Sequence, residues 1–217
     1  MQDRVCFITG GASGIGEACV RRFVAAGYHV AFGDVQEHKG AQLALELGDR
    51  VVFHRLDVSV EVEFAAALDA TVRRWGQLDC LVNNAAIGGV MGPIAAIPID
   101  EYEYACNIIQ RSVFIGLKHA ARIMQPRQAG SIVNIASIAG LKGGYGPHIY
   151  NRAFASMRYA PAILKRRFTP VYAMSAGKRG SRRSARNWSM ISRWTAWDCP
   201  KKLPRPCFGW RVMNQAM

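Results

Sequence analysis

Acidic residues are almost absent from the last third of the chain. Residues 151–217 contain 15 Lys and Arg but one Asp or Glu, whereas residues 1–150 contain 13 and 14 of these residues. The formal net charge of +13 therefore comes from residues 151–217. A uniformly basic protein, which would indicate a nucleic acid or an anionic membrane as partner, is excluded.

Spaced cysteine pairs and long apolar runs are also missing. No C-x-x-C pair or zinc-ligand spacing is formed by the six cysteines, which are Cys6, Cys19, Cys80, Cys106, Cys199 and Cys207. Such thiols are typical of a reducing compartment, and they predict no metal site. The apolar run after Asp3 and Arg4 is too short for a secretory signal, and the uncharged residues 83–99 are interrupted by Gly and Pro. We therefore predict a cytoplasmic protein without a membrane partner.

Short apolar runs alternate with amphipathic segments along the first 150 residues. The apolar runs predict strands at residues 5–8, 29–32, 51–53, 78–82 and 131–135. The spacing of apolar residues between them predicts helices at residues 15–26, 36–47, 60–75 and 99–124. Fully apolar strands joined by helices are typical of a parallel sheet covered on both faces. The predicted fold class is therefore α/β, with a doubly wound parallel sheet.

A glycine-rich turn separates the first predicted strand from the first predicted helix. It reads T-G-G-A-S-G-I-G at residues 9–16. Its glycines allow the backbone to approach a pyrophosphate, and the free N–H groups at the helix start attract negative charge. The candidate cofactor-binding residues of this turn are Gly10, Ser13, Gly14, Ile15 and Gly16. The alternative is that the segment is an ordinary turn.

Asp34 stands at the end of the second predicted strand, 18 residues after Gly16. A carboxylate at this place accepts hydrogen bonds from the ribose hydroxyls of adenosine and repels a 2′-phosphate. Together with the glycine-rich turn, it favours NAD over NADP as the cofactor. The alternative for Asp34 is a surface carboxylate at a strand end.

Further short motifs follow the turn and Asp34. They are L-D-V at residues 56–58, N-N-A-A at residues 83–86, Asn107, Ser137 and Tyr150. With the turn, these motifs resemble the short-chain dehydrogenase/reductase family in its NAD-preferring form, over residues 4–151. The resemblance implies a Rossmann sheet with its strands in the order 3-2-1-4-5.

The resemblance also implies the roles of two further pairs of residues. Asp57 and Val58 are expected to border the adenine, and Asn84 and Ala85 are expected to pass along the nicotinamide ribose. The family usually has Gly where this chain has Ala86. The alternative for the adjacent asparagines at 83 and 84 is a purely structural role, in which they tie two strands together.

The resemblance implies a catalytic group of Asn107, Ser137 and Tyr150. In this family the tyrosine hydroxyl exchanges a proton with the oxygen of a secondary alcohol or ketone, and the serine holds that oxygen. Hydride moves to or from the nicotinamide, while the helix asparagine positions a water. Small-molecule alcohols and ketones are the implied substrates. The alternatives are a turn residue for Ser137, a polar helix residue for Asn107 and a surface ring for Tyr150.

One member of the family's catalytic group is missing. The family has Lys one helical turn after its Tyr, where the ammonium group binds the ribose and lowers the pKa of the tyrosine. This chain has Phe154 at that position, and its next lysine is Lys165. Lys165 is too far along the chain to substitute without an unusual loop. We therefore expect this chain to be inactive, although the resemblance implies an NAD-dependent oxidoreductase that acts on CH–OH groups.

Residues 152–217 show neither helical nor strand periodicity and contain four of the five tryptophans. Arg and Trp together are typical of a nucleic-acid-binding arm, but no recognition motif supports that interpretation. A shifted reading frame joins the third base of each codon to the first two bases of the next codon. In that frame, the codons possible for residues 152–162 can encode a segment that resembles the family's sixth strand. Residues 199–217 admit one that resembles a later helix. The hypothesis is that coding sequence was lost after residue 151 and that the rest is translated out of frame.

Two parts of the chain follow from this hypothesis. Residues 1–151 form a truncated dinucleotide-binding domain, and residues 152–217 form a basic, disordered tail. The sheet is expected to stop at five strands and to leave residues 131–136 as an open apolar edge. The homo-oligomer interface of the family is expected to be lost. Two other functions stay open: an NAD-binding module without chemistry, and a basic protein that binds nucleic acid through its tail.

Overall fold

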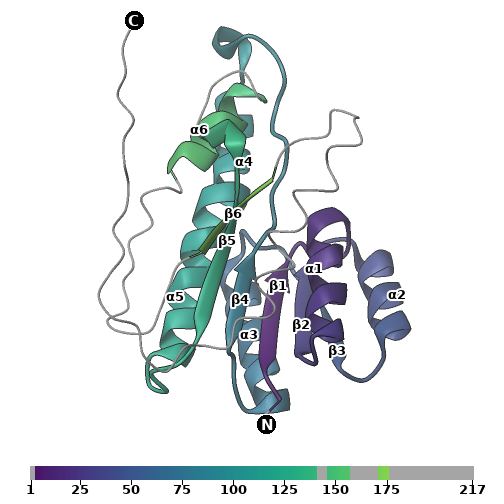
Figure 1. Ribbon diagram of the computed structural model, residues 1–217. Helices are drawn as coiled ribbons and strands as arrows, with labels where there is room; N and C mark the ends of the chain where they lie inside the picture. The colour runs from purple at the N-terminus through teal and green to yellow at the C-terminus, as the bar shows by residue number, and fades with distance from the viewer. Residues whose placement is uncertain (1–2, 141–145, 157–170, 176–217) are drawn as a thin grey trace, which may run out of the picture. The chain divides into compact units, whose positions relative to one another are not determined.

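Six parallel strands form the central sheet of the protein (Figure 1). The computed structural model describes residues 3–140, 146–156 and 171–175, which belong to one compact unit within residues 1–179. The strands are β1 (Val5–Thr9), β2 (His29–Asp34), β3 (Val51–Arg55), β4 (Cys80–Asn83), β5 (Ser131–Ser137) and β6 (Val171–Ser175). Their order in the sheet is β3-β2-β1-β4-β5-β6. The predicted order of the first five strands is confirmed.

The register of the sheet brings the carboxyl ends of three strands to one edge. Thr9 of β1 lies opposite Gly33 of β2, and Ile8 of β1 lies opposite Val82 of β4. The loops that follow β1, β2 and β4 therefore begin next to one another. These loops and the first turn of α1, which begins at Gly14, contain seven of the ten predicted cofactor-binding residues, so the fold itself brings them together.

Helices cover both faces of the sheet, as the fully apolar strands predict. They are α1 (Gly14–Ala25), α2 (Glu37–Leu47), α3 (Glu61–Trp75) and α5 (Ser112–Met124). On one face, α1 and α2 pack on Ile8 and Phe32. On the other face, α3 and α5 pack on Phe7 and Leu81. Because successive side chains of a strand point to opposite faces, β1 supplies both cores from adjacent residues.

The helix predicted at residues 99–124 contains a π-helical segment. α4 (Ile99–Cys106) is followed directly by the π-helical η2 (Asn107–Arg111) and then by α5. A π turn holds more residues than an α turn, so side chains before it are rotated about the helix axis relative to those after it. The shorter elements are η1 (Ile94–Ala96), η3 (Ile138–Gly140) and α6 (His148–Ser156). Within the described ranges, no helix has both the length and the apolarity to cross a membrane.

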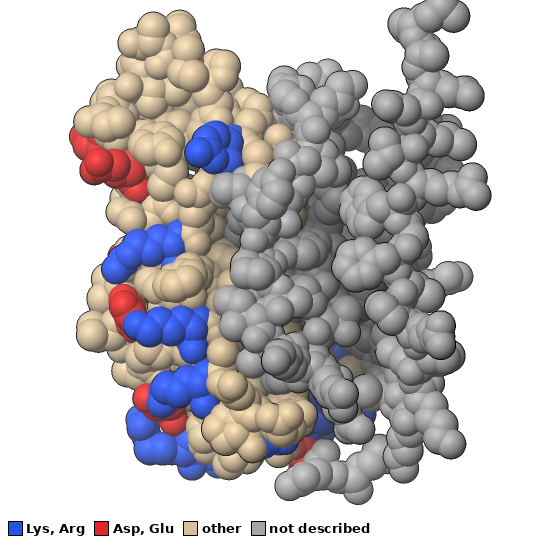
Figure 2. Space-filling model, turned by 90° about the vertical axis from the view of Figure 1, so that its left-hand side faces the viewer, with Lys and Arg blue, Asp and Glu red and all other residues tan. Residues whose placement is uncertain are grey.

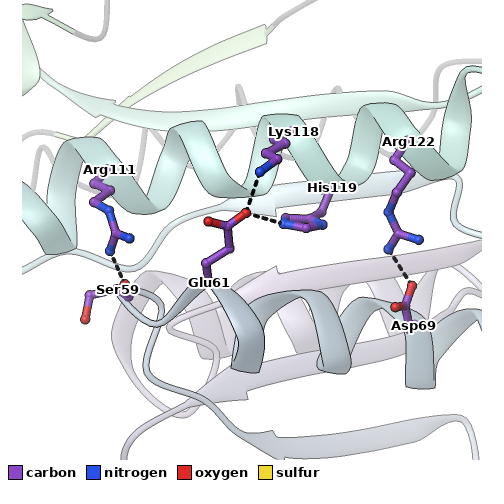
Figure 3. A network of polar contacts seen from close by, with 7 residues as sticks. All are labelled: Ser59, Glu61, Asp69, Arg111, Lys118, His119 and Arg122. Atoms are coloured by element: carbon purple, nitrogen blue, oxygen red, sulfur yellow. Dashed lines mark hydrogen bonds and ion pairs between the residues drawn. The ribbon is translucent and has the colours of Figure 1, made fainter.

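Ion pairs connect α5 with α3 (Figure 3). Glu61 Oε1 accepts a hydrogen bond from Lys118 Nζ at 2.7 Å and lies 3.0 Å from His119 Nε2. One turn further along α5, Arg122 binds Asp69 at 2.6 Å. Figure 2 shows Lys and Arg side chains next to Asp and Glu side chains on the surface that the described residues form. Within residues 1–150, the positive charges of basic side chains are therefore balanced by acidic side chains close to them.

β6 corrects the expectation of an open edge at residues 131–136. Its pairing with β5 is parallel and runs from Val171 opposite Val133 to Ser175 opposite Ser137. An edge strand presents free backbone N–H and C=O groups, and an uncharged extended segment satisfies them. The predicted disordered tail therefore contains the end of α6 and all of β6. The rest of that predicted tail, on which the nucleic-acid-binding alternative depends, lies outside the described residues.

Three thiols lie inside the core on the α1 side of the sheet. Cys6, Cys19 and Cys80 are buried and reduced, and Cys106 is half-buried. Burial raises the pKa of the Cys19 thiol to about 11, and burial also raises that of Cys6 well above its ordinary value. In the part of the chain that the structure describes, no cluster of three His, Cys, Asp or Glu side chains is arranged to hold a metal ion.

Candidate functional site

A cavity of about 450 Å³ opens at the carboxyl ends of the strands. Eight of the ten predicted cofactor-binding residues line it: Gly10, Ser13, Ile15, Asp34, Asp57, Val58, Asn84 and Ala85. Gly14 and Gly16 lie in the same turn but do not line the cavity wall. Of the predicted catalytic residues, Tyr150 lines the cavity, whereas Asn107 and Ser137 do not.

The glycine-rich turn is held close to two neighbouring loops. The N–H of Gly10 donates to the carbonyl of Gly33 at 2.8 Å. A Cβ atom at Gly16 would stand 1.8 Å from the carbonyl oxygen of Gly10, so this position admits glycine alone without a shift of the backbone. Gly14 has a φ of +60° and faces open space, with no atom within 4 Å of its missing Cβ. The turn therefore presents bare backbone at the point where α1 begins.

The first turn of α1 keeps its backbone N–H groups free of a side-chain cap. Ser13 stands at the N-cap position, but its hydroxyl makes no capping hydrogen bond. Instead Ser13 Oγ accepts a hydrogen bond from the side-chain amide of Gln36 at 3.2 Å. Uncapped N–H groups at a helix start are the usual donors to a phosphate anion. The geometry of this turn therefore fits a pyrophosphate.

Asp34 is buried at the end of β2, and its carboxylate is held by backbone groups. Its Oδ2 accepts a hydrogen bond from the N–H of Ala12 at 3.0 Å, and its Oδ1 accepts one from the N–H of Gln36 at 3.0 Å. The Gln36 side chain donates to the same Oδ1 at 3.3 Å. A carboxylate oxygen has two lone pairs, so Oδ2 can still accept a hydroxyl hydrogen from the cavity.

Asp57 and Val58 form the next part of the wall, but Asp57 serves its own loop. Its Oδ1 accepts hydrogen bonds from the backbone N–H and the hydroxyl of Ser59, at 2.9 and 2.7 Å. The N–H of Asp57 donates to Glu63 of α3 at 2.9 Å. Val58 packs in the core between the sheet and α3. Both residues line the cavity from a loop that α3 holds in place.

Asn83 and Asn84 tie strands together. Asn83 Nδ2 donates to Asn134 Oδ1 on β5 at 2.9 Å. Asn84 Nδ2 donates to the carbonyls of Thr9 and Gly10 at 3.0 and 3.1 Å, and its N–H donates to the Thr9 hydroxyl at 3.0 Å. The structural alternative for this pair is thus observed in the structure. Asn84 also lines the cavity, so its hydrogen bonds hold the glycine-rich turn beside the cavity wall.

The three predicted catalytic residues differ in their surroundings. Tyr150 of α6 lines the cavity. Ser137 is buried at the end of β5, where its hydroxyl accepts a hydrogen bond from the N–H of Ala139 at 3.2 Å. Asn107 is exposed at the start of the π-helical segment.

The comparison with known proteins decides the family. Residues 4–157 match the family model described as short chain dehydrogenase. The chain belongs to the short-chain dehydrogenase family. This is a family of oxidoreductases that act on CH–OH groups.

Curated relatives match about two thirds of the chain. (+)-Borneol dehydrogenase 2 of Salvia officinalis is 43% identical over 150 residues, which make up 68% of this chain and 53% of that protein. Xanthoxin dehydrogenase of Arabidopsis thaliana is 39% identical over 153 residues, 68% of this chain and 54% of that protein. The chain thus spans about half the length of these curated relatives.

Solved structures show the same family relationship. An NAD⁺-bound xylitol dehydrogenase is similar with a TM-score of 0.68 and 29% identity, over 71% of this chain and 60% of that chain. Serine dehydrogenase from Escherichia coli gives a TM-score of 0.67 and 27% identity, over 71% of both chains.

Phe154 stands where the short-chain dehydrogenase pattern has Lys, and it is packed against Tyr150. The two ring centroids are 4.6 Å apart, with an angle of 55° between the ring planes. Phe154 is 4% exposed and belongs to a small core with Ile109 and Val113 of the helix opposite. The aromatic ring therefore fills the space beside Tyr150 with apolar atoms.

Sequence reasoning missed several wall residues. The sequence contains a clue for Gln36, which stands two residues after an Asp at a strand end, where an Asx turn is common. Ile135 and Ala136 were signalled by their place near the carboxyl end of a parallel strand. Tyr104 and Ile108 also line the cavity. No local sequence pattern predicts that Tyr104 and Ile108 line the cavity, because the direction in which this helix points its side chains depends on the π turn.

Proposed function

We propose that this chain binds NAD in the cavity and catalyses little or no hydride transfer. The proposal has two parts that rest on different segments. Binding rests on the loops after β1 and β2, and the loss of catalysis rests on α6. When bound, NAD supplies the nicotinamide ring that accepts or gives hydride in exchange with a secondary alcohol or ketone.

The observation that supports NAD is the joint geometry of Asp34 and the start of α1. Asp34 would accept the ribose hydroxyls of the adenosine, while the uncapped N–H groups after Gly14 would bind the pyrophosphate. A 2′-phosphate beside the buried Asp34 carboxylate would be repelled, since two negative charges would share one partly dry site. These features favour NAD over NADP.

The observation that supports inactivity is the absence of a cation from the described cavity wall. No Lys or Arg occurs among the described residues that line the cavity, and Phe154 occupies the turn of α6 where the family has its ammonium group. Tyr150 would have to give and take its proton without that charge beside it.

A binding titration and a turnover assay test the two parts separately. Calorimetry on the full chain should show binding of NAD and of ADP-ribose, and weaker binding of NADP. Incubation with NAD and a panel of secondary alcohols should give no NADH absorbance above the rate without protein. Failure to bind ADP-ribose would overturn the proposal that the chain binds NAD. Turnover that is lost in Tyr150→Phe would overturn the proposal that the chain is inactive.

We also propose that the chain departs from its relatives through a change of reading frame after residue 151. The match to the family model ends at residue 157, and the two curated relatives named above each match 68% of the chain. Sequencing the transcript around codon 151 tests the proposal. An uninterrupted gene whose neighbouring frame encodes nothing similar to the family would overturn it.

A further inference from the structure

The side chain of Gln36 connects two loops at the Asp34 end of the cavity. Gln36 is half-buried at the N-cap position of α2 and lines the cavity together with Ser13 and Asp34. Its Nε2 atom donates to Ser13 Oγ at 3.2 Å and to Asp34 Oδ1 at 3.3 Å. The glycine-rich turn after β1 and the loop after β2 are therefore joined through one amide group.

Lys39 fixes the direction of this amide. Its Nζ atom donates to Gln36 Oε1 at 2.7 Å. An ammonium group can only donate hydrogen bonds, so the atom beside it must be the amide oxygen. The two hydrogens of the amide nitrogen are then left for Ser13 and Asp34. All three contacts therefore agree with a single orientation of the Gln36 amide.

Gln36 occupies one oxygen of the Asp34 carboxylate and leaves the other open. Asp34 Oδ1 accepts two hydrogen bonds from Gln36, one from its backbone N–H and one from its side chain. Asp34 Oδ2 accepts one, from the N–H of Ala12. Because a carboxylate oxygen has two lone pairs, the acceptor position that remains on this carboxylate is at Oδ2.

The hydroxyl of Ser13 is left with the opposite capacity. Its oxygen accepts a hydrogen bond from Gln36, and it makes no capping bond to α1. Among the described residues, none accepts the hydroxyl hydrogen of Ser13. One end of the cavity therefore offers an open acceptor on Asp34 and an open donor on Ser13. A sugar diol has the matching groups, since each of its hydroxyls can both donate and accept.

We propose that Gln36 is a positioning residue that adapts this end of the cavity to the ribose diol of adenosine. The inference rests on the proposed function, because it needs a dinucleotide in the cavity. Gln36 acts through Asp34 and Ser13, whose side chains would lose their shared partner without the amide and could turn away from the diol. Loss of hydrogen bonds of this kind predicts that recognition of the diol falls by about threefold or more.

Two ligands measure recognition of the diol. One is ADP-ribose, and the other is an analogue of ADP-ribose whose adenosine lacks both ribose hydroxyls. Calorimetry on the full-length chain gives the dissociation constant of each, and the analogue should bind about tenfold less tightly or worse. Failure of ADP-ribose to bind would overturn the proposed function and this inference with it. Binding of both ligands with equal affinity would overturn this inference alone.

Three variants test the assignment to the amide group. Gln36→Met keeps the length of the side chain but removes the amide, so the ratio of the two constants should fall by about threefold. Gln36→Glu places a second carboxylate beside Asp34, so ADP-ribose should bind more weakly to it than to Gln36→Met. Gln42→Met is the matched control, since Gln42 is exposed on the same helix and does not line the cavity, and it should keep the wild-type ratio.

A purely structural role for Gln36 predicts a different result. In that case Gln36→Met would lower the free energy of unfolding, which denaturant unfolding measures, and would weaken the binding of both ligands equally. A wild-type ratio in Gln36→Met would therefore overturn the inference. An equal fall of the ratio in Gln42→Met would overturn it as well, and so would tighter binding of ADP-ribose to Gln36→Glu than to Gln36→Met.

Discussion

The two ends of the cavity differ in how their polar groups are held. At the adenosine end, both carboxylate oxygens of Asp34 accept backbone hydrogen bonds, and a side-chain amide joins Gln36 to Ser13. At the other end, Tyr150 has an aromatic ring as its neighbour. One end offers backbone N–H groups and a carboxylate, and the other offers apolar surface.

The difference supports the proposal that cofactor binding and chemistry depend on separate segments of this fold. The loops after β1, β2 and β4 are fixed by the sheet and by contacts among themselves. The groups proposed for proton transfer come from β5 and α6, and the match to the family model ends just after α6, at residue 157. A chain can therefore keep the first function when the second is lost.

Restoring the cation beside Tyr150 should have the largest effect. In Phe154→Lys, the ammonium group would stabilise the tyrosinate form and raise turnover of secondary alcohols by about 10²-fold or more. NADH absorbance measures the gain. The double variant Tyr150→Phe with Phe154→Lys is the control, and it should lose the gain entirely. No gain in a folded Phe154→Lys protein would show that the second end lacks more than its cation.

A methyl group at the glycine-rich turn should damage the first end. Gly16→Ala places a Cβ against the Gly10 carbonyl oxygen, so the backbone must shift. The free energy of unfolding should fall by about 1–3 kcal/mol, and the affinity for ADP-ribose should fall with it. Denaturant unfolding and calorimetry measure the two effects. Gly88→Ala is the matched control, because no atom lies within 4 Å of its missing Cβ.

Removing the charge of Asp34 should have a smaller effect on the same end. Asp34→Asn keeps the shape but weakens the hydrogen bonds to a ribose, so NAD should bind about fivefold to tenfold less tightly. The discrimination against NADP should fall as well, because the repulsion of a 2′-phosphate is gone. Asp49→Asn, in an exposed loop outside the cavity, provides the comparison. Equal discrimination in both variants would contradict the role given to Asp34.

The smallest effect is expected far from both ends, at the contact between α3 and α5. Lys118, and then His119, hold the pKa of Glu61 below its ordinary value of 4.5. A lowered folded-state pKa means that the ionised carboxylate stabilises the fold at higher pH and that this contribution is lost as the pH falls through that lowered value.

Glu61→Gln should therefore be slightly less stable than the wild type near neutral pH, and the difference should fade in acid and at high salt. Thermal unfolding at several pH values measures it. The affinity for ADP-ribose should not change. A change in that affinity would show that the α3–α5 contact is coupled to the cavity.

The sequence was sufficient for the parts of the structure that depend on local patterns. The apolar strands predicted a parallel sheet, and the family resemblance implied its strand order. The glycine-rich turn and Asp34 predicted residues that line the cavity, because parallel strands bring their carboxyl ends together. β6 was not predicted, since its pairing depends on a free edge of β5 rather than on a pattern in residues 171–175. The exposure of Asn107 was not predicted either, because a π turn changes which side chains face the cavity.

Three thiols buried between α1 and the sheet can report how often this part of the structure opens. Cys6 and Cys80 are neighbours on adjacent strands, and Cys19 is on the helix that covers them. An alkylating reagent can reach these sulfur atoms only when α1 separates from the sheet. The rate of alkylation at each cysteine, measured on its peptide, would therefore report how often α1 separates from the sheet. If the chain binds a dinucleotide as proposed, the bound protein should be labelled more slowly than the free protein.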